Sequence, residues 1–409
     1  MTADVRTGWD RMAARRLSRI AVSPMGKLLA RTSELRAAGI DVINLGIGEP
    51  DFATPRHIRH AATTAMNSGD TKYTTVDGTI AVKKAVQEKF HRENGLDFSL
   101  AEIGVANGAK QSLFNAIIAT VEEGDEVIIP LPAWSSYIDM VELAGGTVVT
   151  ADCTANPGFT LDAADLEAAI TDRTKWLLLN FPNNPTGAVL GRSDLEAIAA
   201  VLVRHPHVWV LSDDIYEHLI FDGGKFISIL EVEPALRGRC LIVNGVSKAY
   251  SMTGWRIGYA AGPAQLIKAM AAVQSQATSN PSSIGQAAAC AALLEDQSEV
   301  GLMRAEFEKR RNLVVDLLAG IRGLSCPRPL GAFYVFPNCS DLIGSRTPSG
   351  ATIGSDDDLA SYLLEEAAVG VIPGSAFGAS PYLRLSIAAS EDALRTALAR
   401  IRSAVDKLS

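Results

Sequence analysis

The middle of the chain alternates between two apolar patterns, and this alternation restricts the fold more than any other feature. Helical spacing of apolar residues is clear at Leu113, Phe114, Ile117, Ile118 and Val121. Between such stretches lie short, continuous apolar runs at 127–129, 176–179, 208–211 and 241–243. A strand without polar alternation is buried on both faces, as in parallel sheets covered by helices. The sequence therefore predicts an α/β fold with a mainly parallel sheet.

The last hundred residues follow a different pattern. A charged helical pattern over 303–318 precedes short predicted strands near 332–336 and 382–386, and a final helix is expected near 391–407. This order predicts a smaller α+β domain made of residues 301–409 together with the N-terminal segment 1–48. Residues 49–300 would form the large domain. We expect one long helix, at about 285–315, to connect the two domains as a hinge.

Composition excludes several classes of protein. The chain has 409 residues with 38 Lys and Arg against 46 Asp and Glu, a net charge of −8, which does not favour a nucleic-acid partner. No apolar run reaches the roughly 18 to 20 residues that span a membrane. The cysteines lie far apart without a Cys-x-x-Cys pair, so no disulfide framework and no metal site are predicted. We expect a soluble, cytoplasmic protein.

Polar and aromatic side chains follow the predicted strands where each strand ends. The residues in question are Trp134, Asn184, Asp213 and Lys248. Each could have a common structural role of its own: packing, a turn, a helix cap and a solvated loop, respectively. However, the carboxyl ends of parallel strands meet at one edge of a sheet and form a ligand crevice there. Together, the four residues favour a binding site.

These four groups match the requirements of pyridoxal phosphate. A lysine amine forms a Schiff base with an aldehyde, and a carboxylate keeps a pyridine nitrogen protonated. An amide donates to a phenolic oxygen, and an indole stacks on the ring. A phosphate would find Arg256, the hydroxyl of Ser247, and free N–H groups at Gly108 and Ala109, where a helix begins near Lys110. The residues thus indicate this cofactor.

Six motifs in a fixed order carry a resemblance to a known family. They are Asn44-Leu-Gly-Ile-Gly-Glu-Pro-Asp-Phe52, Thr71-Lys-Tyr73, Asn107-Gly-Ala-Lys-Gln111, Asn183-Asn-Pro-Thr-Gly187, Ser212-Asp-Asp-Ile-Tyr216 and Ser247-Lys-Ala-Tyr-Ser-Met-Thr-Gly-Trp-Arg-Ile-Gly-Tyr259. From about residue 18 to its end, the chain resembles the class I aminotransferases of the pyridoxal-phosphate fold-type I superfamily, closest to the aspartate aminotransferase subgroup found in bacteria.

The resemblance implies an architecture and a reaction. The large domain would contain a mainly parallel seven-stranded sheet between helices, next to the smaller α+β domain. The enzyme would move an amino group between an L-amino acid and a 2-oxo acid, alternating between two cofactor forms. By analogy with the family, it would act as a homodimer with shared active sites.

The resemblance also implies the roles of the residues around the cofactor ring. Lys248 would bind the cofactor aldehyde and then move the proton at the substrate Cα, for which its pKa must be lowered. Asp213 would pair with the ring nitrogen. Tyr216 and Asn184 would bind the phenolic oxygen, and Trp134 would stack on the ring.

A second group of residues would hold the cofactor phosphate. The partner subunit's Tyr73 is expected to reach into this site. Gly245 stands where the family often has a hydroxyl, so one phosphate contact is expected to be absent or supplied by water. From this chain, the cofactor-binding residues at this end would be Gly108, Ala109, Lys110, Ser247 and Arg256.

Substrate binding would centre on one arginine. Arg384, in Tyr382-Leu-Arg-Leu-Ser386, occupies the family position for a bidentate contact with the α-carboxylate. Gly48 would offer its backbone N–H, and Trp134 and Asn184 would complete this set.

Specificity for the substrate side chain is where the motifs diverge. Lys110 matches a lysine that helps to bind an acidic side chain, together with hydroxyls of the N-terminal segment. There, Ser23 is kept, but Met25 stands in place of an expected threonine. The second arginine of other aspartate aminotransferases aligns with Ser275. Lys110 favours aspartate or glutamate, whereas Met25 favours an aromatic or other apolar amino acid.

Two further activities stay open at this point. The same scaffold supports β-elimination from a cysteine conjugate, because the same Cα carbanion serves both reactions. A ligand-sensing regulator would instead need a DNA-binding segment of about 60 residues before the match, and only about 17 residues precede it. The aminotransferase interpretation is favoured over both.

Overall fold

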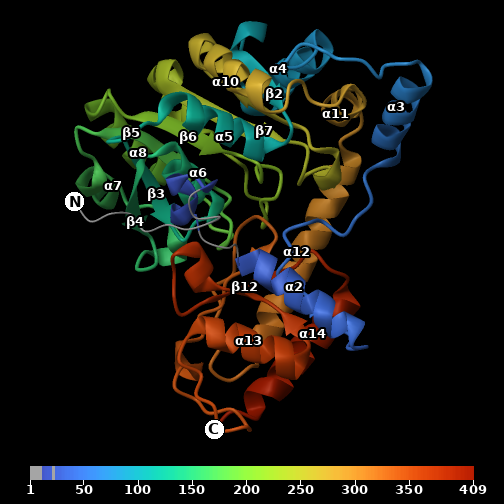
Figure 1. The fold of residues 1–409 in the computed structure, drawn as a ribbon, viewed down its shortest axis with the longest axis vertical. Coiled ribbons are helices and arrows are strands. Elements are labelled where there is room, and N and C mark those ends of the chain that lie inside the picture. The colour runs from blue at the N-terminus through green and yellow to red at the C-terminus, as the bar shows by residue number, and fades with distance from the viewer. Residues whose placement is uncertain (1–11, 21–23) are drawn as a thin grey trace.

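The computed structural model describes residues 12–20 and 24–409, without the side chains of Pro24, Met25 and Lys27. Two parts are evident in Figure 1: an upper part around a large sheet, and a lower part that contains the C-terminal helices. One long helix passes from the upper part to the lower part.

A seven-stranded sheet forms the centre of the upper part. Its spatial order is β2–β8–β7–β6–β5–β3–β4. β8 is antiparallel to both of its neighbours, and the other pairs are parallel. The strands are β2 (Ile103–Ala106), β3 (Glu126–Leu131), β4 (Thr147–Asp152), β5 (Thr174–Leu179), β6 (Trp209–Asp213), β7 (Cys240–Gly245) and β8 (Gly258–Ala261). The predicted mainly parallel seven-stranded sheet is confirmed.

Helices cover both faces of this sheet, which accounts for the continuous apolar runs. Val127 and Ile129 of β3 pack on one face, and Ile128 packs on the other, so every residue of the run is buried. One face carries α5 (Ala109–Thr120), α6 (Ser136–Ala144) and α10 (Ala264–Ala277). The other is covered by α4 (Ile80–Asn94), α7 (Ala163–Ala169), α8 (Arg192–Arg204), α9 (Ile229–Val232) and α11 (Ser283–Leu294), with α3 (Arg56–Asn67) against α11.

The lower part combines the two ends of the chain. A small antiparallel sheet has the order β11–β12–β9. β1 pairs in parallel with β10, and Arg31 of α2 forms two hydrogen bonds with Glu365 of α13, so the N-terminal segment packs on the C-terminal residues. The elements are β1 (Ile43–Asn44), β9 (Tyr334–Val335), β10 (Val369–Gly370), β11 (Ile372–Pro373), β12 (Leu383–Ser386), α2 (Pro24–Ala37), α13 (Asp356–Ala367) and α14 (Glu391–Asp406).

The connection between the parts differs from the prediction. The expected single helix at 285–315 is wrong, because α11 ends at Leu294 and a separate helix, α12 (Ser298–Leu318), enters the lower part. Between the two helices, the carboxylate of Asp296 accepts a hydrogen bond of 2.9 Å from the backbone N–H of Ser298, the first residue of α12. The division into 49–300 and the remainder stays a prediction.

Candidate active site

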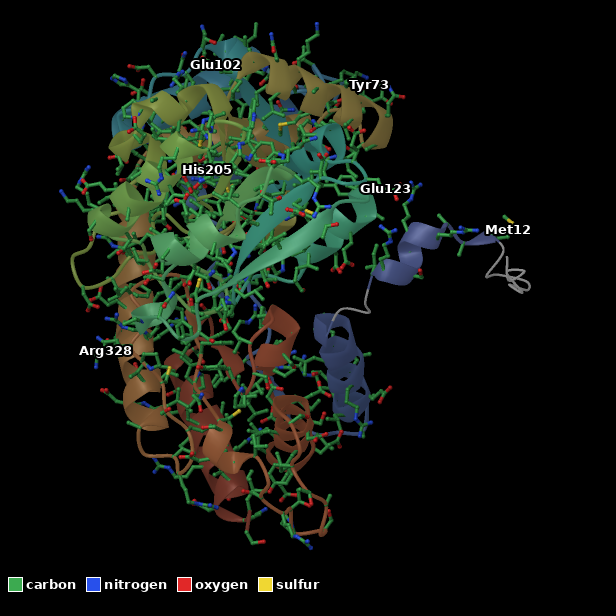
Figure 2. All side chains as sticks on the ribbon, turned by 90° about the vertical axis from the view of Figure 1, so that its left-hand side faces the viewer. Met12, Tyr73, Glu102, Glu123, His205 and Arg328 are labelled. Atoms are coloured by element: carbon green, nitrogen blue, oxygen red, sulfur yellow. The ribbon has the colours of Figure 1, made fainter. Side chains whose placement is uncertain are left out.

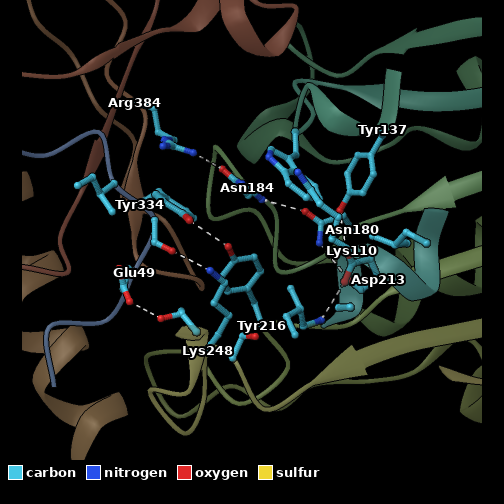
Figure 3. A pocket seen from close by; sticks show the side chains of 18 of the residues that line it. Glu49, Lys110, Tyr137, Asn180, Asn184, Asp213, Tyr216, Lys248, Tyr334 and Arg384 are labelled. Carbon is cyan, nitrogen blue, oxygen red and sulfur yellow. Dashed lines mark hydrogen bonds between the residues drawn. The ribbon is translucent and has the colours of Figure 1, made fainter. Parts of the chain in front are cut away.

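A cavity of about 420 Å³ lies where the carboxyl ends of the central strands face the lower part. Side chains from both parts line it, and Figure 3 shows most of them. The sequence-predicted residues among its lining are Gly48, Ala109, Lys110, Trp134, Asn184, Asp213, Tyr216, Ser247, Lys248, Arg256 and Arg384. The structure therefore brings together residues separated by more than three hundred positions in the chain.

Lys248 reaches the cavity from the loop that follows β7. Its Nζ donates a hydrogen bond of 2.7 Å to the carbonyl oxygen of Gly48 and lies 5.7 Å from the ring centre of Phe333. Burial lowers the pKa of Lys248 to about 8, and the positive charges of Arg384 and Arg256 act in the same direction. An amine in this state accepts protons readily near neutral pH, which suits a general base.

Asp213 ends β6 and points into the same cavity. It is only 3% exposed, and its Oδ2 accepts a hydrogen bond of 2.7 Å from the hydroxyl of Tyr137. Asn180 donates to its backbone carbonyl oxygen at 2.9 Å. Burial raises the pKa of Asp213 to about 6, although the contacts with Tyr137 and Ile215 favour the charged form. A buried carboxylate of this kind is suited to pair with a cationic ring nitrogen.

Tyr216 and Arg384 both contact Tyr334, and Arg384 lies 4.6 Å from its ring centre. The hydroxyl of Tyr216 lies 3.0 Å from that of Tyr334. Arg384 on β12 is 3% exposed and donates from Nη1 to Asn184 Oδ1 at 2.9 Å, and from Nη2 to the carbonyl oxygen of Gly46. Its Nε is buried without a hydrogen-bond partner. Arg384 therefore keeps one N–H, on Nε, that no described group of the chain accepts.

The start of α5 forms a close backbone approach at the other end of the cavity. Gly108 caps this helix with a φ of 89°, a conformation that favours glycine. A Cβ at Gly108 would lie 2.4 Å from Arg256 Nη2, so a larger residue would displace the guanidinium. Ser247 is buried nearby, while Arg256 is exposed and donates to the carbonyl oxygen of Thr253 at 2.9 Å. Free N–H groups, a hydroxyl and a guanidinium suit an anion.

Lys110 and Trp134 lie at the rim of the cavity. Lys110 Nζ is 4.4 Å from a ring centre of Trp134 and donates to Ser136 Oγ at 3.1 Å. Partial burial and the nearby Arg256 guanidinium lower the pKa of Lys110, while Asp139 raises it. The Trp134 indole also packs edge-on against Tyr137 at 5.3 Å.

Some of the predicted residues that the structure describes do not line the cavity: Gly108, which directly precedes the lining residue Ala109, and Tyr73 and Ser275. Tyr73 is 91% exposed on the outer surface of the upper part, as Figure 2 shows. Ser275, on α10, is exposed and donates to the carbonyl oxygen of Ala272. Ser23 and the side chain of Met25 lie outside the described residues.

The sequence analysis missed several residues of the site. Asn180 directly follows β5, so the rule that selected Asn184 would also have selected it. Tyr137 stands one turn beyond Trp134 and could have been found by that spacing. Tyr334 gave no signal, because it lies on a short strand of the lower part. Glu49 lines the cavity and accepts a hydrogen bond from Thr253, a contact between distant loops.

Comparisons with known proteins agree with this geometry. Residues 40–401 match the family model described as aminotransferase class I and II. The chain is similar to the aspartate aminotransferase of Rhizobium meliloti, with 55% identity over 97% of each chain. It is 52% identical to the aspartate/prephenate aminotransferase of Cereibacter sphaeroides, over 95% of this chain and 97% of the relative. The crystal structure of the Rhizobium meliloti enzyme superposes with a TM-score of 0.95 at 54% identity, covering 97% of this chain and 99% of that one.

Proposed function

Because the chain belongs to the class I and II aminotransferase family, we propose that it exchanges an amino group between aspartate or glutamate and a 2-oxo acid, with pyridoxal phosphate as cofactor. Relatives whose names specify aspartate, or aspartate and prephenate, support this substrate class. One observation carries the proposal: a lysine with a lowered pKa and a buried arginine face one cavity beside a buried aspartate.

The residues present fit the cofactor. Asp213 is a buried carboxylate whose pKa is raised by burial although Lys248 acts against it, and a protonated ring nitrogen beside it would stabilise its charged form. Gly108 leaves room for the guanidinium of Arg256 at the start of α5, where Ser247, Ala109 and Lys110 could join it around a phosphate. When bound, pyridoxal phosphate withdraws electrons from the substrate Cα.

The chain's own residues then handle the proton and the ring. Lys248 Nζ would hold the cofactor and, once the substrate has released it, would move the proton from the substrate Cα to the cofactor carbon. Tyr216 and Asn184 would donate to the ring oxygen, Trp134 would stack on the ring, and Asp213 would keep the ring nitrogen protonated.

Arg384 binds the substrate α-carboxylate in this proposal. Its unpaired Nε and its two Nη atoms provide a fork that matches two carboxylate oxygens. The backbone N–H of Gly48 supplies a further donor, and Trp134 and Asn184 flank the substrate. Because Asn184 Oδ1 already holds the guanidinium, the arginine is oriented before the substrate arrives.

Lys110 favours an acidic side chain on the substrate, since its ammonium stands at the cavity rim. An aromatic or other apolar amino acid remains the alternative substrate, on account of Met25, and a C–S β-lyase remains the alternative reaction. Among the described residues, no helix is both long and apolar enough to cross a membrane. We further propose that the protein is a cytoplasmic homodimer, in which the partner subunit's Tyr73 completes the phosphate site. We also propose that residues 49–300 form one domain and that residues 1–48 and 301–409 form the other.

A half-reaction screen tests the function. Single amino acids are mixed with the cofactor-loaded protein, and the loss of its visible absorbance is followed. Conversion by aspartate or glutamate to the amino form of the cofactor supports the proposal. Reaction with aromatic or sulfur amino acids only would favour the Met25 alternative, and release of pyruvate without the amino form would indicate a lyase.

A further inference from the structure

A buried ion pair lies outside the cavity, and one of its members is next in sequence to a lining residue. Lys89 on α4 has no exposed surface, and Glu217, in the loop after β6, is 7% exposed. Their side chains form a direct salt bridge. Neither residue lines the cavity, and the proposed reaction uses neither.

Three side chains from two elements of the upper part, α4 and β7, hold the carboxylate of Glu217. Asn244 of β7 donates to Oε1 at 2.7 Å, and Asn94 at the end of α4 donates to Oε2 at 3.1 Å. Lys89 Nζ also donates to Asn94 Oδ1 at 2.8 Å. Burial raises the pKa of Glu217, but the charges of Lys89 and His218 and the hydrogen bonds from Lys89 and Asn94 together outweigh it, so that the pKa is lowered. Glu217 is therefore charged, and both of its carboxylate oxygens accept hydrogen bonds from the upper part. We call it the anchor of its loop.

The anchor is adjacent in sequence to a residue of the site. Glu217 directly follows Tyr216, and the backbone N–H of Glu217 donates to the carbonyl oxygen of Asp214 at 2.9 Å in the same turn. Tyr216 lines the cavity, as Figure 3 shows, whereas Glu217 is not among the lining residues. Asn244 lies four residues before Lys248, so the network also touches the strand that leads to the lysine.

Contacts of the Tyr216 ring with the lower part do not replace this anchor. The hydroxyl of Tyr216 meets Tyr334, and its ring packs edge-on against Phe333 at 5.4 Å. Both partners belong to the lower part, which is joined to the upper part through α12. The fixed position of Tyr216 relative to the sheet therefore depends on its own loop.

Neither metal binding nor stability accounts well for this network. Ligand atoms of Glu93, Glu217 and His218 cluster within 4.8 Å of one another, as for a cation. However, Lys89 already contacts both carboxylates and offsets one of their two charges, lying 3.7 Å from Glu93, and His218 Nε2 bonds to Glu93 at 2.9 Å. Stability is also a weak reason, because a buried pair often contributes little net free energy. Further ionisable groups facing this network are Asp214 and Tyr250.

We propose that the Lys89–Glu217 ion pair positions Tyr216: it holds the Tyr216 hydroxyl at the ring oxygen and keeps Tyr216 in a fixed position relative to Lys248. The inference rests on the proposed function in one respect, the contact between Tyr216 and the cofactor ring. Glu217 acts through Tyr216, so neither Glu217 nor Lys89 touches a reacting atom.

A double-mutant cycle tests this inference. The midpoint of the pH titration of the visible band is measured, without substrate, for the cofactor-loaded wild type, Glu217→Gln, Tyr216→Phe and the double variant. A hydrogen-bond donor at the ring oxygen stabilises the negative charge there. It thereby lowers the pKa of the nitrogen that would join Lys248 to the cofactor. Both single changes are therefore expected to raise the midpoint, and Glu217→Gln is expected to add nothing once Tyr216 is phenylalanine. Additive shifts, or no shift with Glu217→Gln, would overturn the inference.

Controls separate positioning from stability. Glu126→Gln removes another buried carboxylate, which binds Arg173 at the opposite end of the sheet, and should leave the midpoint unchanged. If Glu217→Gln fails to fold, Lys89→Met combined with Glu217→Gln removes both charges; its melting temperature should recover while the midpoint stays raised. Recovery of both would contradict the inference.

Kinetics give an independent readout. Misplacing a contact residue lowers kcat by up to about 100-fold, so Glu217→Gln should lower kcat for whichever amino acid the wild type accepts, and change KM little. An unchanged kcat would contradict the inference. A wild type without a pH-sensitive visible band would instead overturn the proposed function, so the two failures are distinguishable.

Discussion

The two ends of the cavity are built differently. One end, which we call the ring end because we propose that the cofactor ring binds there, contains Asp213, Tyr216 and Arg384. These three side chains are buried and hydrogen-bonded to residues of this same chain. At the phosphate end, Lys110 and Arg256 are exposed. The buried groups at the ring end are thus held by contacts within this chain, whereas the two cations at the phosphate end stay exposed.

The largest expected effect is at the ring end. Lys248→Ala should lower turnover by at least about 1000-fold, because the base at the substrate Cα is lost. Turnover and the visible absorbance of the cofactor-loaded protein should disappear together. Lys268→Ala, on an exposed position of α10, serves as the control. Transamination at the wild-type rate by the Lys248 variant would refute the central assignment.

Arg384→Lys tests whether the fork is needed. A lysine presents a point charge and cannot bind two carboxylate oxygens in one plane, and it also loses the contact with Asn184. The loss of a charged hydrogen bond should raise KM for the amino acid by about 10- to 100-fold. Initial rates over a range of amino-acid concentrations give this value. Arg395→Lys, at an exposed position, should behave as the wild type.

The pH dependence of stability sharpens the contrast between the two ends. In the cofactor-free protein, burial lowers the pKa of Lys248 from 10.5 to about 8. Between these values the unfolded chain binds more protons than the folded one, so this lysine makes the free energy of unfolding increase as the pH rises from about 8 to 10.5. The same contribution is lost as the pH falls through 8.

Lys248→Met removes this contribution. Urea unfolding at pH steps from about 8 to about 10.5 should show the wild type gaining stability relative to the variant. Lys268→Met provides the matched comparison, because that lysine is exposed. Parallel curves for the wild type and Lys248→Met would show that the amine is not buried in solution.

The smallest effect is expected at the phosphate end. Tyr73→Phe should weaken cofactor retention about fivefold, the value of one hydrogen bond. Dissociation of the cofactor during dialysis measures this change, with Tyr362→Phe, whose hydroxyl binds the carbonyl oxygen of Ala404, as the control. Unchanged retention would count against a site shared between subunits.

Much of the fold was readable from the sequence because its signals are local. The apolar runs at 127–129, 176–179 and 241–243 lie within β3, β5 and β7, and the final helix, expected near 391–407, spans Glu391–Asp406. The family resemblance is confirmed by the comparisons. The break between α11 and α12 was missed. Only Glu295, Asp296 and Gln297 separate the two helices, and so short an interruption barely changes the helical pattern of the sequence.

The sequence by itself determined the order of strands and helices and the residue types at the ends of the strands, since burial periodicity and motif spacing are properties of consecutive residues. Only the tertiary structure decided that Tyr334 meets Tyr216, that Lys89 neutralises Glu217 and that Gly108 makes room for Arg256. These contacts join residues far apart in the chain. Their geometry and their pKa values depend on how closely separate elements pack, and no local pattern records that distance.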